Sequence, residues 1–181
     1  MEATKRKWAI FALVGGATFV LDEATKIAVR HTLPALGAAG KSIIGRTVVL
    51  TYAENTGVAF SQFRTLPGGR ILLSVLAAVA LASVISYVRR ADPARRGLAA
   101  GLGLVAGGAA GNLCDRALLG NVTDFVLVDL GFWPFHPWAV FNVADVALVV
   151  GLGVLVILMF RHRARESPQP PAAPRVEPPT G

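Results

Sequence analysis

Long apolar runs without charge are the strongest feature in the pattern of hydrophobic and polar positions along the chain. The hydrocarbon core of a bilayer is about 30 Å thick, and a helix needs about 20 mostly apolar residues to cross it. Residues 71–88, 97–113 and 137–160 meet this requirement, and each is predicted to be a transmembrane helix. Residues 8–29 reach spanning length once the charged positions at their far end are included, so they are predicted to form a first span.

Basic residues lie beside the ends of these spans and indicate an orientation. They form three groups: Lys5, Arg6 and Lys7 before the first span, Arg89, Arg90, Arg95 and Arg96 between the second and third, and Arg161, Arg163 and Arg165 after the fourth. With four crossings, all three groups fall on one side of the membrane. Because positively charged loops tend to stay in the cytoplasm, both termini are predicted to be cytoplasmic, with residues 30–70 and 114–136 on the outer face.

Two stretches of the outer segments are predicted to be extended. Residues 47–52 and 122–129 are rich in β-branched side chains and have turn-forming residues nearby. The Trp and Phe residues between 132 and 138 fit the aromatic belt that membrane proteins place at the lipid–water boundary. The predicted fold class is therefore an α-helical polytopic membrane protein, with four transmembrane helices and a small extracytoplasmic β element.

The composition agrees with this fold class and indicates one domain. Of the 181 residues, 54% are apolar and 16% are charged, whereas about a quarter are charged in an ordinary soluble domain. The length fits one compact unit, which we assign to a single membrane-embedded domain at residues 1–165. Residues 166–181 are rich in proline and have little to bury, so we expect a disordered cytoplasmic tail.

The charge and the cysteine content exclude several classes of function. A net charge of +7 would fit a nucleic-acid-binding protein, but here the basic residues flank apolar spans, so no nucleic-acid partner is expected. Cys114 is the single cysteine and cannot form an internal disulfide. His31, His136 and His162 are not at metal-ligand spacing, so no metal site is predicted.

Asp145 is the polar position that most requires an explanation, because an ionisable residue inside a membrane span is costly and marks a functional site by default. If the fourth span is helical from Trp138, Asp145 lies about 10 Å below the outer interface. Asn142, three residues earlier, would then share its helix face. The structural alternative for Asp145 is a buried salt bridge, for example to Arg116.

Asp124 lies in an extended stretch at a similar depth, so it could meet Asp145 across a pocket. Two carboxylates that share a site cannot easily both ionise, so the pair holds one proton and offers an acid and a base together. Such a pair can activate water against a peptide carbonyl, with Asn112, Asn142 or Arg116 orienting the substrate or stabilising charge. The alternative use of the same carboxylates is a proton relay in a small carrier.

Other polar positions have structural explanations. Asp22 and Lys26 form an i, i+4 pair of opposite charge, which predicts a clamp near the outer end of the first span. Asn55 lies in a turn signal and either caps that turn or points into the site; the sequence does not separate the two. The glycines of the third span permit close helix packing, which would also suit a non-catalytic scaffold that assembles through this span.

Five sequence blocks, in order along the chain, resemble the lipoprotein signal peptidase family, also called signal peptidase II, a family of bacterial membrane aspartic proteases. The resemblance covers almost all of residues 8–160. The blocks are LDEATK at 21–26, ENTGVAFS at 54–61, GGAAGNLCDR at 107–116, VTDFVLV at 122–128 and FNVADVAL at 141–148.

This resemblance implies an activity and a set of site residues. Asp124 and Asp145 match the catalytic dyad of the family. The polar positions that the family places around its active site correspond to Asp22, Asn55, Asn112, Arg116 and Asn142. The implied activity is that of an aspartic endopeptidase, which removes signal peptides from diacylglyceryl-modified prolipoproteins by cutting on the amino side of the lipid-modified cysteine.

The resemblance also sets expectations about partners and location. The expected partners are the lipidated prolipoprotein and the membrane lipids. No metal or organic cofactor is expected, and the cyclic peptide globomycin should inhibit the cleavage. We expect a monomer in the bacterial inner membrane, with the active site near the extracytoplasmic face.

Three departures from the family pattern leave the dyad intact. Glu23 stands where the family more usually has Gln, Val58 stands where Ala is frequent, and the tail after Arg165 has no counterpart in the family's core. Among the rival functions, a carrier is disfavoured because four spans show no evident inverted repeat. A scaffold leaves the costly Asp145 without an explanation.

Overall fold

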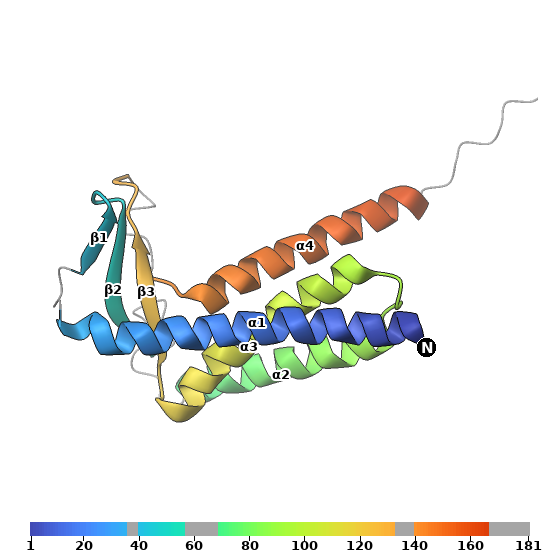
Figure 1. Cartoon of the computed structure of the whole chain (residues 1–181), viewed down its shortest axis with the longest axis horizontal. Coiled ribbons are helices and arrows are strands. Elements are labelled where there is room, and N and C mark those ends of the chain that lie inside the picture. Colours follow the sequence, from blue (N-terminus) through green and yellow to red (C-terminus); the bar gives the residue numbers. More distant parts are fainter. Residues whose placement is uncertain (36–39, 57–68, 133–139, 167–181) are drawn as a thin grey trace, which may run out of the picture.

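The computed structural model describes residues 1–35, 40–56, 69–132 and 140–166. In this part of the chain, a bundle of helices carries a small sheet at one end (Figure 1). The helices are α1 (Glu2–Thr32), α2 (Gly69–Arg90), α3 (Arg96–Leu118) and α4 (Val143–Glu166), and the strands are β1 (Lys41–Ile44), β2 (Val48–Asn55) and β3 (Val122–Val128).

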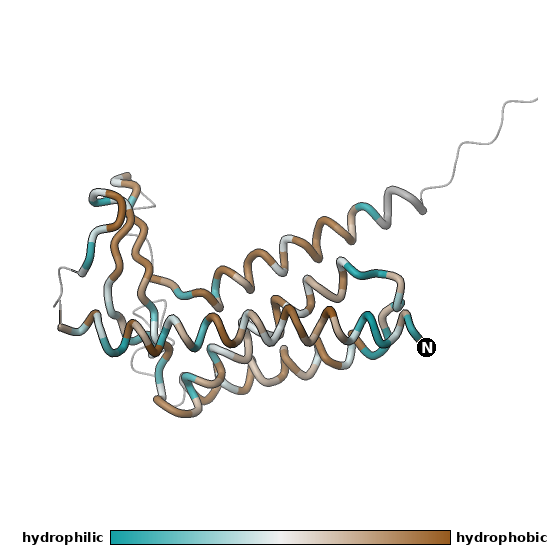
Figure 2. Tube along the Cα trace, in the orientation of Figure 1, coloured by the Kyte–Doolittle hydropathy of each residue, from teal (hydrophilic) through white to brown (hydrophobic). Residues whose placement is uncertain are grey.

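The four helices of the described part are each long and apolar enough to cross a membrane. Figure 2 shows an apolar middle of the bundle between more polar ends. Large apolar side chains such as Leu13, Val79 and Val149 are exposed on the outside of the bundle. Such extensive apolar surface is typical of contact with lipid. The predicted fold class, a polytopic helical membrane protein with a small β element, is confirmed.

The predicted start of the fourth span differs from the observed one. The other three predicted spans lie inside α1, α2 and α3, but α4 begins at Val143 rather than at residue 137. Residues 140–142 are not helical because Phe141 pairs with β3: its N–H donates to the carbonyl of Val126 (3.0 Å), and its carbonyl accepts from the N–H of Val126 (2.8 Å). The sheet therefore determines where α4 begins.

The sheet is antiparallel, in the order β1-β2-β3. Its pairing places Asn55 opposite Val122 and Ala53 opposite Asp124. The two predicted extended stretches are both strands, and β2 continues three residues beyond its predicted end at residue 52. Strand β1 was not predicted, because its four residues are all exposed and show no alternation of apolar and polar positions.

Helix α3 lies at the centre of the bundle and contacts α1, α2 and α4. Two neighbouring glycines allow this close packing on two sides. A Cβ atom added at Gly107 would collide with the backbone oxygen of Gly15 in α1, and one added at Gly108 would lie 2.6 Å from the backbone oxygen of Ala144 in α4. The backbones of α1 and α4 therefore approach α3 at positions where a side chain would keep them apart.

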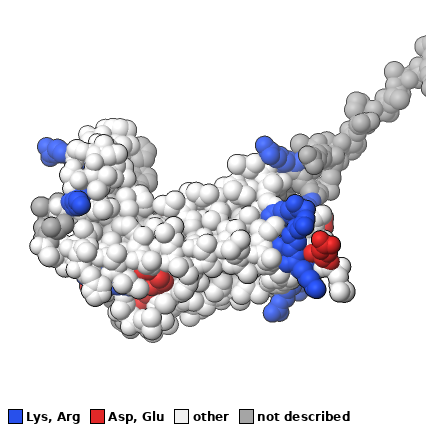
Figure 3. Space-filling model, viewed as in Figure 1, with Lys and Arg blue, Asp and Glu red and all other residues white. Residues whose placement is uncertain are grey.

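Basic side chains gather at the end of the bundle opposite the sheet (Figure 3). The chain starts at this end, α2 connects to α3 there, and α4 finishes there. The buried ammonium of Lys7 in α1 joins two of these parts by donating to the carbonyls of Val88 and Ala91, each at 2.7 Å. The three basic groups of the sequence therefore share one end of the molecule.

Candidate active site

Asp124 and Asp145 belong to one polar cluster at the sheet end of the bundle. Asp124 lies in β3 and Asp145 lies in the first turn of α4. Asn142 contacts both carboxylates: its side-chain Nδ2 donates to Oδ1 of Asp124 (2.7 Å), and its backbone N–H donates to Oδ2 of Asp145 (3.1 Å). One residue thus connects two acids that lie 21 positions apart in the sequence.

Asn142 has this position because it caps α4. Its Oδ1 accepts from the backbone N–H of Asp145 (3.0 Å), while the carboxylate of Asp145 accepts from the backbone N–H of Asn142. This reciprocal pair is a capping box, in which side chains satisfy amides that the helix leaves unpaired. The expectation that Asn142 and Asp145 share a helix face is wrong, because Asn142 precedes the helix. The depth argument from Trp138 fails with it, because α4 begins after that residue.

Asp124 is held from two sides and is almost fully buried, with 2% of its surface exposed. Nδ2 of Asn55, at the end of β2, donates to Oδ2 of Asp124 (2.9 Å), and Asn142 holds the other oxygen. Burial raises the pKa of Asp124 to about 6, with a further increase from the charge of Asp145, while the hydrogen bonds from Asn55 and Asn142 act in the opposite direction. Of the two roles considered for Asn55, the structure shows a side chain that points into the site.

Asn112 of α3 completes the contacts of Asp145. Its Nδ2 donates to Oδ1 of Asp145 (2.9 Å), and its Oδ1 accepts from Nδ2 of Asn142 (3.0 Å). Arg116, one helical turn later, donates to the backbone carbonyl of Asn112 (3.3 Å), and its charge interacts with those of Asp145 and Asp124. Both residues predicted from the third span therefore lie beside the two acids.

Asp22 is fully buried and joins α1 to the start of α4. Its Oδ1 accepts from the backbone N–H of Ala144 (2.8 Å), and its Oδ2 lies 2.7 Å from Nζ of Lys26. The predicted clamp between Asp22 and Lys26 is present, but it also supports the helix turn that carries Asp145. Asp22 thus acts on the site through the backbone of α4 and Lys26.

A second set of charged residues fixes β3 next to the bundle, and the sequence analysis missed most of it. Asp115 accepts from the backbone N–H of Thr123 (2.8 Å) and from the guanidinium of Arg30 (2.9 Å). Arg30 also donates to the hydroxyl of Thr123 (2.9 Å), the residue before Asp124. The signal was present in the spacing, since Asp22, Lys26 and Arg30 recur every four residues on one face of α1.

Other predicted features lie away from the cluster or outside the described residues. His31 is exposed near the end of α1. Three predicted features lie wholly or partly outside the described residues: the end of the ENTGVAFS block (57–61), the aromatic residues at 133–138 and the tail from residue 167. Within those described, no group of three His, Cys, Asp or Glu side chains could hold a metal ion.

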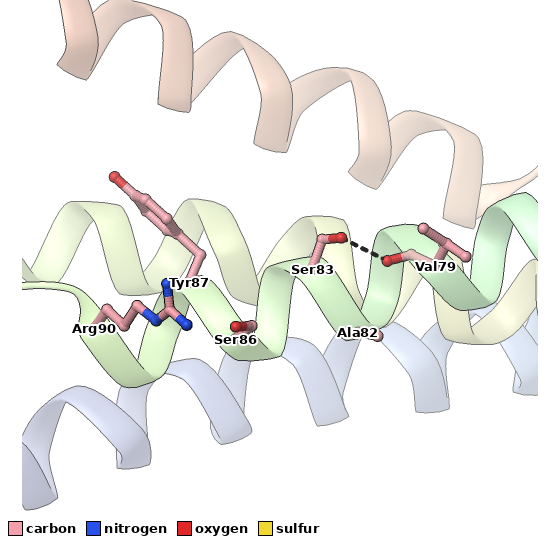
Figure 4. Close-up of a pocket in the computed structure, with 6 residues that line it drawn as sticks. All are labelled: Val79, Ala82, Ser83, Ser86, Tyr87 and Arg90. Atoms are coloured by element: carbon pink, nitrogen blue, oxygen red, sulfur yellow. Dashed lines mark hydrogen bonds between the residues drawn. The ribbon is translucent and has the colours of Figure 1, made fainter.

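An open hollow of about 480 Å³ on α2, lined by residues including Ser83, Tyr87 and Arg90, shares no residue with the acidic cluster (Figure 4).

Comparisons with known proteins agree on one family. A family model described as signal peptidase (SPase) II matches residues 14–161. The lipoprotein signal peptidase of Geobacter metallireducens is 36% identical over 163 residues, which cover 90% of this chain and 98% of that protein. The lipoprotein signal peptidase of Chlorobaculum tepidum is 38% identical over 154 residues, which cover 82% of this chain and 93% of that protein.

A solved structure of a bacterial membrane enzyme has the same fold. It superposes with a TM-score of 0.73 and covers 88% of this chain and 93% of its own, at 20% sequence identity. A second solved bacterial membrane enzyme also gives a TM-score of 0.73, at 21% identity.

Proposed function

The chain belongs to the signal peptidase II family, and from this premise we propose that it removes signal peptides from diacylglyceryl-modified prolipoproteins, cutting on the amino side of the lipid-modified cysteine. The observation that carries the proposal is the pair of acids, Asp124 and Asp145, which contact the same Asn142 at one end of a membrane-spanning bundle. A carrier is not favoured, since the matching relatives are named peptidases.

The catalytic type that this pair supports is that of an aspartic endopeptidase. Two neighbouring acids that share one proton supply a base, which takes a proton from the attacking water, and an acid, which protonates the peptide carbonyl oxygen. Asn142, Asn112 and Asn55 hold the carboxylates in place through the hydrogen bonds described above. Arg116 supplies a positive charge beside them. The hydrolysis itself needs only these side chains and water.

The depth of the site suits a substrate that is itself embedded in lipid. If the basic end of the bundle faces the cytoplasm, as the positive-inside rule predicts, the acids lie near the outer face of the inner membrane. A prolipoprotein with its acyl chains in the bilayer can then approach from the side while water enters from outside. We propose a monomer as the active unit.

The test is cleavage of a lipidated prolipoprotein by the purified protein, followed as a mobility shift on a gel. We expect the wild-type chain to release the signal peptide, and Asp124→Asn and Asp145→Asn each to reduce the rate by about 10⁴-fold or more while the variants remain folded in the membrane. Asp129→Asn is the matched control, since Asp129 follows β3 at the far end of the strand. Near-normal turnover in either dyad variant would refute the assignment.

A further inference from the structure

Two lysines of α1 are buried in the bundle, and one of them lies beside the acidic cluster. Lys26 is fully buried, and its Nζ lies 2.7 Å from Oδ2 of Asp22 and 3.4 Å from Oδ2 of Asp115. The same Nζ donates to Oδ1 of Asn112 (3.0 Å). The ammonium is thus compensated by two carboxylates and bonded to a neutral amide.

The contact with Lys26 determines which way the amide of Asn112 faces. An ammonium group has three donors and no acceptor, so the atom of Asn112 that it meets must be the oxygen. Nδ2 of Asn142 donates to that same oxygen (3.0 Å). The amide nitrogen of Asn112 is therefore the atom that faces Asp145, and it donates to Oδ1 of that carboxylate (2.9 Å).

The two acids have unequal surroundings. Asp145 receives the N–H of Asn112 and the backbone N–H of Asn142, and it lies in the first turn of α4, where the helix N-terminus favours a negative charge. Asp124 also accepts from two N–H groups, those of Asn55 and Asn142, but it lies in a strand and is almost fully buried. The positive charge of Arg116 lies near both acids and favours the ionised form of each. The pKa of Asp124, raised by its burial to about 6, agrees with this difference.

We propose that Lys26 is a positioning residue for the reaction: by holding the oxygen of Asn112, it presents the amide nitrogen to Asp145, so that Asp145 is the ionised base and Asp124 carries the shared proton. This inference rests on the proposed function of the same site. It gives different roles to two acids that the family resemblance treats as a pair.

The assignment fixes the path of each proton. As the water oxygen bonds to the peptide carbon, one water proton passes to Asp145, and the proton of Asp124 passes to the carbonyl oxygen. The product of this step is a neutral gem-diol, with Asp145 protonated and Asp124 ionised. In the second step the carbon–nitrogen bond breaks, the amine nitrogen takes the proton from Asp145, and a hydroxyl of the gem-diol returns a proton to Asp124. Both acids then have their starting charges.

The test removes the ammonium without leaving a buried charge unpaired. In the double variant Asp22→Asn/Lys26→Met, both members of the fully buried pair become neutral, and Asn at position 22 can still accept from the N–H of Ala144. With the prolipoprotein as substrate, we expect kcat to fall about 10- to 100-fold while KM changes little, because the amide of Asn112 loses the group that orients it, while Asn at position 22 keeps the bond to α4 and Arg30 still pairs with Asp115.

The pH profile separates positioning from a merely structural role. Charged groups near the two acids, Asp124 and Asp145, include Lys26 and Asp22 of α1 and Asp115 and Arg116 of α3. We expect the acidic limb of kcat/KM to move to higher pH in the double variant, because a carboxylate that loses a donor accepts a proton more readily. A purely structural role would lower the active fraction and leave this limb unchanged.

Lys7→Met is the matched control, since Lys7 is also a buried lysine of α1 but caps the end of α2 through Val88 and Ala91. This variant should lose thermal stability and keep the wild-type kcat and pH profile. If the double variant fails to fold, Asn112→Asp provides the second test: it keeps an acceptor for Lys26, and it replaces the amide donor that faces Asp145 with a carboxylate oxygen, so the donor is lost and a like charge is added.

The outcomes separate the two proposals. If the wild-type chain does not cleave the prolipoprotein, the proposed function is wrong. If the wild-type chain cleaves, but the double variant or Asn112→Asp keeps a wild-type kcat and acidic limb, the role of Lys26 is wrong and the function stands. A lower kcat together with a shifted limb supports the role of Lys26.

Discussion

Asn142 connects the fold and the proposed chemistry at the scale of a single residue. Its oxygen caps α4, its side-chain nitrogen donates to Asp124 and Asn112, and its backbone N–H donates to Asp145. Because the cap and the carboxylate contacts use different atoms of Asn142, substitutions can remove them separately.

We expect Asn142→Ser to separate these roles. Serine is also a good N-cap, so Asn142→Ser should be more stable than Asn142→Ala by about 1 kcal/mol. Both variants lack the amide that holds Asp124, so both should cleave the prolipoprotein about 100-fold more slowly. Thermal unfolding in detergent and the gel-shift assay measure the two effects. Wild-type turnover in the serine variant would contradict the role given to the amide.

The ionised carboxylate of Asp124 should destabilise the folded chain at neutral pH, because it is buried. Its pKa in the folded state, about 6, lies above the ordinary value of 3.8, so the folded chain binds this proton more tightly than the unfolded chain does. The stability from Asp124 is then fully present below about pH 4 and is lost as the pH rises to about 6.

We therefore expect Asp124→Asn to be inactive, and we expect its stability relative to the wild-type chain to rise by about 1–3 kcal/mol between about pH 4 and about pH 7. The difference in Tm between the two should grow as the pH rises from about 4 to about 6 and then remain constant. A difference that does not change with pH would show that the proton of Asp124 does not contribute to stability.

At the scale of elements, the position of α3 between α1 and α4 depends on glycine. Gly108 faces the backbone of Ala144, the residue before Asp145, so the contact of α3 with α4 lies directly beside the proposed site. A change in this packing should move the first turn of α4 and with it Asp145, the proposed base.

Gly108→Ala should therefore reduce both stability and activity. Its Cβ would lie 2.6 Å from the oxygen of Ala144, and such overpacking typically costs about 1–3 kcal/mol. Gly153→Ala, in the middle of the same α4, is the control, since nothing lies within 4 Å of an added Cβ. The control should melt at the same or a slightly higher temperature, because alanine favours a helix by up to about 1 kcal/mol. Equal melting temperatures and equal cleavage rates in the two variants would argue against the packing role of Gly108.

At the scale of the whole molecule, the charge distribution predicts an orientation in the membrane. The basic residues and the sheet lie at opposite ends of the bundle (Figures 1 and 3). The two ends should therefore lie at opposite faces of the membrane. In a Cys114→Ala background, we expect Ser42→Cys in β1 to react with a membrane-impermeant maleimide added outside spheroplasts. Asp92→Cys, in the connection between α2 and α3, should react only after lysis. The reverse pattern would place the site on the cytoplasmic side.

The proline-rich tail should be dispensable for cleavage. Within the described residues, the acidic cluster ends at Asp145 in the first turn of α4, and the sequence of the tail offers little apolar surface to bury. Removal of residues 167–181 should change kcat/KM for the prolipoprotein less than about twofold, whereas a larger loss would assign the tail a role in catalysis or substrate binding.

The sequence by itself determined the four spans and pointed to Asp124 and Asp145. Hydropathy is a local property, and a charged side chain in an apolar run is visible without coordinates. The sequence did not determine the start of α4 or the role of Asn142 as a cap, because both depend on the pairing of Phe141 with β3.

Only the tertiary structure decided which polar groups meet. Lys26 lies 86 positions from Asn112, and Arg30 lies 85 from Asp115, and no local pattern ranks these partners above others. Close packing of α1 and α4 on the glycines of α3 brings the groups within hydrogen-bond reach. Because a buried ammonium or amide must find partners, the helix packing also determines the orientation of Asn112, on which the different roles proposed for the two acids depend.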